Sequence, residues 1–168
     1  MKSNKVRLMC ITAVMTALTF VVTAYLHIPT NNGYVHVGDG IIYLAACLLP
    51  TPYAVLVGAG GALLADVLTG YAIWAPGSVL IKAMTVPVFS AKDKKIITLR
   101  NSLALLPATV ICAGGYYLYE ALIYGNFISP LAGISASLTQ SVTSGILFVT
   151  AGLAIDKMKF KQKLNSGI

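Results

Sequence analysis

The stretch that decides the fold is "LLADVLTGYAIWAPGSVLIKA", residues 63–83. Two apolar arms flank a centre rich in glycine and proline, which is typical of a turn between two helices. One arm carries Asp66 and the other carries Lys82. Because a charge is costly in an apolar medium, each of these residues needs a partner there. The stretch therefore predicts a helical hairpin whose two charges lie at similar depth and form an ion pair.

The composition places this hairpin in a membrane. The chain has 168 residues, of which 57% are hydrophobic and only 10% are charged, and its mean hydropathy is +0.81. A soluble domain has roughly 25% charged residues. This chain has too little polar material to cover a globule, and its length suits one domain over residues 1–168.

The basic residues mark which side of the membrane each loop faces. Eleven of the twelve basic residues border apolar segments in three short blocks, which are Lys2, Lys5 and Arg7, then Lys92, Lys94, Lys95 and Arg100, then Lys157, Lys159, Lys161 and Lys163. Cytoplasmic loops carry such an excess of Lys and Arg. This distribution argues against nucleic-acid binding and predicts that both termini lie in the cytoplasm.

Six apolar segments give an all-α membrane protein with six transmembrane helices. Their approximate ranges are 8–28, 38–50, 52–70, 77–91, 101–124 and 131–156. An even number of spans agrees with two cytoplasmic ends. The second and fourth segments are short for a hydrocarbon core of about 30 Å, so we expect them to stop part-way or to continue as buried irregular chain.

The polar residues inside these segments all fall in the outer half of the predicted bundle. Tyr116 and Glu120 are four residues apart on one helical face, and a stripe of Ser137, Gln140, Ser141 and Ser144 follows the sixth segment. Aromatic groups with a few convergent polar groups are typical of a small-molecule pocket. The polar stripe also suits helix–helix hydrogen bonds, so both interpretations stay open.

Other charged residues also allow two interpretations. Asp66 and Lys82 either close on each other as a structural pair or lend a charge to a ligand. Asp39 suits an N-cap of the second helix, and Glu120 suits the headgroup level with the aromatic belt. His27 and His36 flank the first outer loop without a metal-site partner at useful spacing, so no metal site is predicted.

Residues 33–83, "GYVHVGDGIIYLAACLLPTPYAVLVGAGGALLADVLTGYAIWAPGSVLIKA", carry a family resemblance. They include Gly38-Asp39 before the second segment, Ala65-Asp66 late in the third and Lys82 in the fourth. Ala13 and Ala17 form an AxxxA pair in the first segment. Over essentially its whole length the chain resembles the substrate-binding S-component of an energy-coupling factor (ECF) transporter, in the riboflavin-type group.

The resemblance implies how such a chain works. An S-component binds a vitamin in an outward-facing pocket, lidded by the first outer loop. It docks through its AxxxA face, here Ala13 and Ala17, on a transmembrane coupling subunit with two ATPase subunits. ATP is then used by the partners, and this chain is expected to need no cofactor of its own. The implied location is the bacterial cytoplasmic membrane.

The resemblance also implies a substrate-binding set. The candidates are Asn32, Tyr34, His36, Asp39, Trp74, Lys82, Tyr116, Glu120, Gln140 and Ser144. Tyrosines, Trp74 and a few hydrogen-bonding groups suit a small ring with hydroxymethyl groups, so vitamin B6 or a related pyridine or pyrimidine is favoured, with riboflavin as the alternative substrate. A stand-alone channel or secondary carrier for a small polar solute is the alternative function. No nucleophile or metal motif indicates an enzyme.

Overall fold

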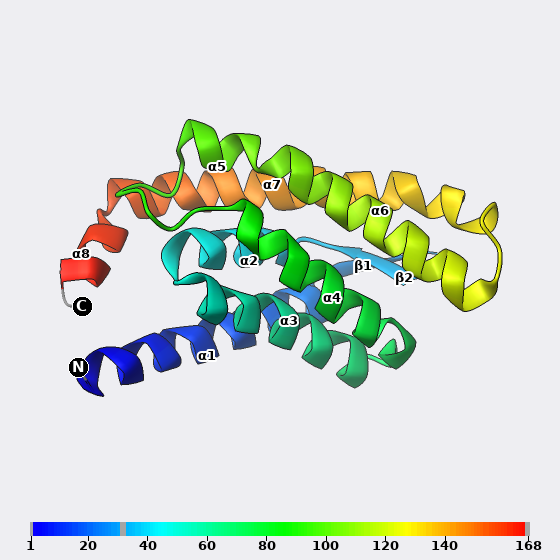
Figure 1. The fold of residues 1–168 in the computed structure, drawn as a ribbon, viewed down its shortest axis with the longest axis horizontal. Coiled ribbons are helices and arrows are strands. Elements are labelled where there is room, and N and C mark those ends of the chain that lie inside the picture. The colour runs from blue at the N-terminus through cyan, green and yellow to red at the C-terminus, as the bar shows by residue number, and fades with distance from the viewer. Residues whose placement is uncertain (1, 31–32, 167–168) are drawn as a thin grey trace.

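A computed structural model describes residues 2–30 and 33–166. The described elements are α1 (Lys2–Tyr25), β1 (His27–Thr30), β2 (Gly33–His36), α2 (Gly38–Leu48), α3 (Thr51–Leu68), η1 (Ala72–Trp74), α4 (Ala75–Thr85), η2 (Val86–Val88), α5 (Leu99–Leu103), α6 (Leu105–Tyr124), η3 (Ser129–Gly133), α7 (Ile134–Lys157) and α8 (Phe160–Ser166). The helices form an elongated bundle with both ends of the chain at the same end of its long axis (Figure 1).

Four helical stretches are long and apolar enough to cross a membrane. They are Lys5–Tyr25, Thr51–Leu68, Leu99–Tyr124 and Ser129–Lys157, and two shorter apolar stretches are Gly38–Leu48 and Ala72–Val88. These six stretches correspond to the six predicted segments, and the two short ones are the two that the sequence marks as short. The helical fold is therefore confirmed, whereas six complete crossings stay a prediction.

The first outer loop differs from the sequence prediction because it contains a β-hairpin. Strands β1 and β2 pair antiparallel, with His27 opposite His36 and Ile28 opposite Val35. The hairpin places β2 against α7. An all-α prediction misses it because two strands of four residues carry too little periodicity to be seen in a sequence.

Helix α2 lies at the centre of the bundle and is buried over its whole length. It contacts α1, α3 and α7, as expected for a helix that is apolar on every side. The aromatic core beside it stacks Tyr43 on Phe89, with ring centroids 4.8 Å apart, and Phe148 closes the cluster. Helix α2, which carries Tyr43, lies in the half of the bundle nearer the termini (Figure 1).

Small residues let α1 and α3 approach closely. Thr12, Thr19 and Thr23 on α1 are buried, and the first two lie on the face that packs on α3. A Cβ atom at Gly61 would lie 2.6 Å from the Thr19 side chain, so this crossing requires glycine at position 61. The opposite side of α1, with Ala13 and Ala17, is exposed.

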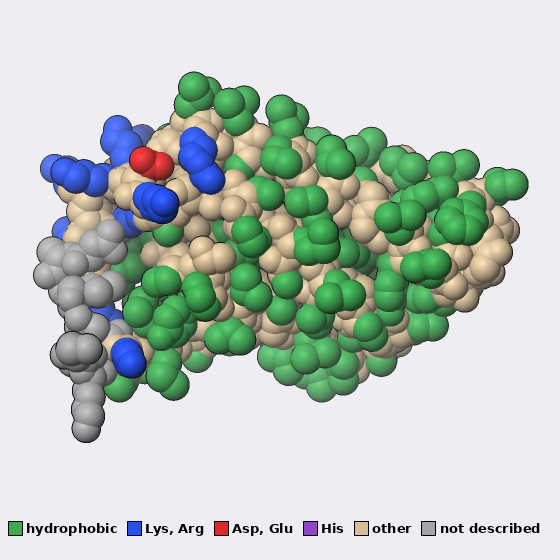
Figure 2. Space-filling view, viewed as in Figure 1, with side chains coloured by type: hydrophobic (Ala, Val, Ile, Leu, Met, Phe, Trp, Pro, Cys, Tyr) green, Lys and Arg blue, Asp and Glu red, His purple; other side chains and the backbone are tan. Residues whose placement is uncertain are grey.

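Polar side chains form hydrogen bonds that hold the basic loop between η2 and α5 in place. The Asp156 carboxylate accepts hydrogen bonds from the backbone N–H groups of Ile96 (2.8 Å) and Ile97 (2.9 Å). The Asn101 amide donates to the carbonyls of Ser90 and Ile96, both at 3.0 Å. Lys and Arg side chains gather at this end of the molecule, beside the termini, and hydrophobic side chains cover much of the remaining visible face (Figure 2).

Helices α5 and α6 are separated at Ala104, three residues before Pro107. Proline has no N–H to donate and its ring clashes with the carbonyl four residues earlier, which is that of Leu103. Pro87 similarly lies in the 3-10 turn η2 that ends the α4 segment. Both prolines therefore lie where a helix is interrupted.

Candidate functional site

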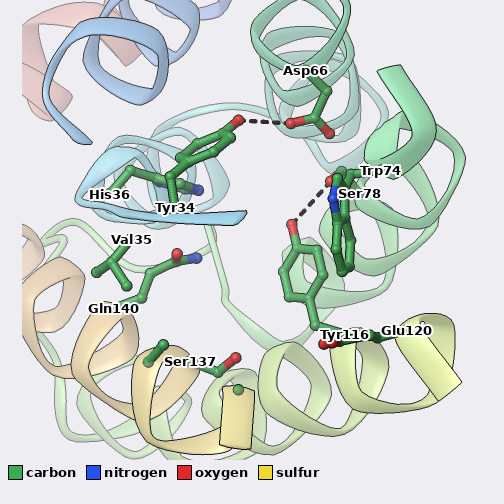
Figure 3. A pocket seen from close by; sticks show the side chains of 12 residues that line it. Tyr34, Val35, His36, Asp66, Trp74, Ser78, Tyr116, Glu120, Ser137 and Gln140 are labelled. Atoms are coloured by element: carbon green, nitrogen blue, oxygen red, sulfur yellow. Dashed lines mark hydrogen bonds between the residues drawn. The ribbon is translucent and has the colours of Figure 1, made fainter. Parts of the chain in front are cut away.

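A cavity opens in the half of the bundle away from the termini. Its volume is about 100 Å³, which is smaller than the range of about 300–1,000 Å³ that is usual for ligand pockets. Its lining comes from β2, the end of α3, the η1–α4 turn, α6, η3 and the start of α7, and comprises Tyr34, Val35, His36, Asp66, Trp74, Ser78, Tyr116, Glu120, Gly133, Ala136, Ser137 and Gln140. Figure 3 shows the polar side chains converging on one open space.

The β-hairpin contributes one wall of this cavity. The Tyr34 hydroxyl donates a hydrogen bond of 2.6 Å to Asp66 Oδ1 on α3 (Figure 3), and the Tyr34 ring packs edge-on to Tyr71. Burial and the neighbouring Asp66 carboxylate raise the pKa of the Tyr34 hydroxyl. The hydroxyl therefore stays protonated and remains a donor to Asp66.

His36 occupies the same strand and is buried. Its Nδ1 accepts a hydrogen bond of 3.1 Å from the backbone N–H of Gly38, so the hydrogen of the neutral ring lies on Nε2. Burial lowers the pKa of His36 to about 4. At neutral pH the ring therefore brings no positive charge to the cavity.

Helices α4 and α6 form the opposite wall. The hydroxyls of Ser78 and Tyr116 lie 3.0 Å apart and share a hydrogen bond (Figure 3). The rings of Trp74 and Tyr116 meet edge to face, with centroids 6.2 Å apart. Glu120, one turn after Tyr116, is 5% exposed and lines the cavity. Its burial among the cavity walls supports the interpretation as a pocket residue, and its level in the membrane stays a prediction.

The predicted ion pair between Asp66 and Lys82 is wrong. The Lys82 ammonium lies 2.8 Å from Asp39 Oδ1 and donates a hydrogen bond of 3.0 Å to Asp39 Oδ2. Helix α2 brings the Asp39 carboxylate against the lysine in place of Asp66. The position of a residue along its own helix can be counted from the sequence. The residue that faces it from another helix cannot be found in this way.

Asp39 is also not the N-cap of α2. The cap residue is Val37, with no side-chain cap, and Asp39 lies in the first turn. Its carboxylate turns into the bundle, where Gln140 donates a hydrogen bond of 2.9 Å to Oδ2. Asp39, Lys82 and Gln140 therefore form a buried polar cluster that links α2, α4 and α7.

The structure thus sorts the candidates of the sequence into two groups. The cavity is lined by Tyr34, His36, Trp74, Tyr116, Glu120 and Gln140. Three others lie outside the lining, since Asp39 and Lys82 pair with each other and Ser144, fully buried, donates to the His36 carbonyl at 3.5 Å. Asn32 lies outside the described residues.

Six lining residues were missing from the predicted substrate set, which are Val35, Asp66, Ser78, Gly133, Ala136 and Ser137. Asp66 was placed in the structural pair, and Ser78 was not considered, although it lies one turn before Lys82. The spacing of Ser78 and Lys82 on one helical face is a signal that the sequence did contain. Ser137, part of the predicted polar stripe, also lines the cavity.

Comparison with known families decides the class of protein. A model of the family described as "ECF-type riboflavin transporter, S component" matches residues 3–157. The chain belongs to this family. A search of curated proteins finds no match. The S-component is therefore a membrane protein and a substrate-specific subunit of an ECF transporter, which is a transport family and not an enzyme family.

Proposed function

We propose that this S-component captures a small water-soluble vitamin in the cavity between the β-hairpin and helices α3, α4, α6 and α7. The observation that supports this most directly is the coincidence of a family match over residues 3–157 with a cavity lined by aromatic and polar side chains. The proposed ligand contacts are the lining side chains of Tyr34, Trp74, Tyr116 and Gln140.

We propose six membrane crossings, with the cavity facing outward and both termini in the cytoplasm of a bacterial cell. The gathering of Lys and Arg beside the termini supports this orientation (Figure 2). Helix α2 is too short to span a bilayer alone, but it is surrounded by protein. Strand β2 directly precedes α2, is paired with β1 and contacts α7, so the chain continues against protein beyond the helix.

The exposed side of α1 is the proposed docking face for a transmembrane coupling subunit. Ala13 and Ala17 are exposed one turn apart, so another helix can approach the α1 backbone closely there. In this arrangement two ATPase subunits bound to the coupling subunit use ATP, and this chain supplies the ligand.

A vitamin B6 compound or a related pyridine or pyrimidine is the favoured ligand, because the cavity offers aromatic rings and several separate hydrogen-bonding groups. Riboflavin is the second candidate, and the description of the matching family favours it.

Uptake into vesicles tests the transport role. Vesicles that contain the chain with its coupling subunit and ATPases should accumulate the labelled vitamin with ATP, whereas vesicles with the chain alone should not. Accumulation by the chain alone along an ion gradient, or passive flux through it, would instead establish the alternative of a secondary carrier or channel.

Tryptophan substitutions test the docking face. Ala13→Trp and Ala17→Trp should each abolish ATP-dependent uptake and leave the affinity of the purified chain for its ligand within about twofold, because both residues lie away from the cavity. The matched control is Val14→Trp, on the same helix, where valine is already large and 67% exposed. Loss of ligand affinity in the alanine variants would contradict a role in docking.

A further inference from the structure

The cavity contains two carboxyl groups and no basic side chain. Asp66 and Glu120 both line it, and its described lining includes neither lysine nor arginine. Lys82 on α4 has a side chain only 3% exposed and is bound to Asp39. His36, the basic group of the lining, is neutral at pH 7 because burial lowers its pKa to about 4. The walls therefore present carboxyl groups, and no positively charged side chain, to a ligand.

Asp66 has an acceptor atom without a partner. The residue is 4% exposed, and its Oδ1 accepts from Tyr34 at 2.6 Å. Within the described residues, its buried Oδ2 has no hydrogen-bond partner. The Ser78 hydroxyl on the facing helix shares its hydrogen bond with Tyr116 instead. A buried carboxylate oxygen that lacks a donor is costly, and a ligand in the cavity can supply that donor.

The rings around this carboxylate also suit a cation. Tyr34, Trp74 and Tyr116 line the same cavity, and the faces of tyrosine and tryptophan attract positively charged nitrogen. Tyr116 already has this contact with Lys82, whose Nζ lies 5.0 Å from the ring centroid. Aromatic faces together with an open carboxylate oxygen are complementary to a planar, positively charged nitrogen compound.

We propose that the cavity selects a ligand with a protonated nitrogen on or beside an aromatic ring, and that Asp66 Oδ2 accepts a hydrogen bond from that nitrogen. The proposal rests on the proposed function and gives the chemical class of its substrate. The protonated nitrogen supplies the donor that Asp66 Oδ2 lacks, and Glu120 is a second carboxyl group of the lining, on the α6 side. An uncharged ring brings no counter-charge to Asp66.

A matched pair of probes separates charge from shape. Pyridoxamine carries a protonated aminomethyl group where pyridoxine carries a neutral hydroxymethyl group, and riboflavin is an uncharged larger ring system. Binding of each to the purified chain can be followed by the fluorescence of Trp74, the single tryptophan of the sequence, which lines the cavity. We expect pyridoxamine to bind at least about tenfold more tightly than pyridoxine, as for a hydrogen bond to a charged group.

Variants assign the preference to the carboxylates. Asp66→Asn should abolish the preference for pyridoxamine, and Glu120→Gln should reduce it. The matched control is Asp93→Asn, which removes the same charge from an exposed residue at the far end of the molecule and should change nothing. Thermal unfolding of each variant verifies that it is folded.

The outcomes distinguish this proposal from the proposed function. Tighter binding of pyridoxine or riboflavin than of pyridoxamine overturns charge selection and leaves the vitamin-binding role intact. A preference for pyridoxamine that survives in Asp66→Asn overturns the role of Asp66. If none of the three compounds binds to the folded chain, the proposed vitamin-binding function fails, and the charge selection fails with it.

Discussion

Two buried carboxylates of the bundle, Asp39 and Asp66, have opposite surroundings. Asp39 contacts an ammonium with both oxygens and receives a third contact from Gln140. Asp66 has a single hydrogen bond, from Tyr34, and within the described residues its second oxygen has no partner. Asp39 is surrounded by protein, whereas Asp66 borders a cavity.

The difference separates two roles of a buried carboxylate in this membrane protein, a structural role and a role in ligand binding. A buried charge is tolerated when a partner of opposite charge and further hydrogen bonds surround it, which describes Asp39. A carboxylate with an open acceptor beside a cavity is incompletely satisfied by the protein alone, which describes Asp66. The first arrangement stabilises the fold, and the second is available to a ligand.

Removal of the cation should have the largest effect on stability. Lys82→Met leaves the Asp39 carboxylate buried without a counter-charge, so we expect the free energy of unfolding to fall by about 3–5 kcal/mol. Thermal unfolding of the purified chain in detergent measures the change.

The matched control removes both charges of the pair. The double variant Asp39→Asn with Lys82→Met should recover most of the lost stability, because replacing a complete buried pair is often neutral. A Lys82→Met chain as stable as the wild type would show that Asp39 does not depend on this partner.

The equivalent change at the open carboxylate should have a much smaller effect. Asp66→Asn removes a buried charge that has no counter-charge, so the ligand-free chain should change in stability by about 1 kcal/mol or less, or become more stable. The same unfolding measurement checks it. A loss as large as that of Lys82→Met would place Asp66 in the structural group.

The smallest effect concerns His36, which lies between the two carboxylate environments. Its pKa falls from the ordinary value of 6.5 to about 4 because burial disfavours the charged ring. Between these values the unfolded chain binds a proton that the folded chain does not, so stability decreases as the pH falls from 6.5 toward 4. His36→Gln should lose less stability than the wild type over this interval, as measured by unfolding temperature. Identical pH profiles would contradict a buried, neutral His36.

Much of the site could be predicted from the sequence because depth along a helix is a local property. Counting residues from the helix ends brought Tyr116, Glu120 and Gln140 to the level of one cavity, and the structure places all three in its lining. The pairing of Lys82 could not be counted in this way. Asp66 is the partner that the sequence predicts, whereas the position of α2 selects Asp39.

By itself, the sequence determined a membrane-embedded helical bundle, its basic end and the half that holds the polar groups, since these follow from hydropathy and from charges beside apolar segments. The tertiary structure decided which residues face each other from different elements of the bundle. It brought α2 to Lys82 and folded the first loop into a hairpin over Asp66. Those contacts depend on which helices are neighbours, and they determine which carboxylate is satisfied within the protein and which one remains open to a ligand.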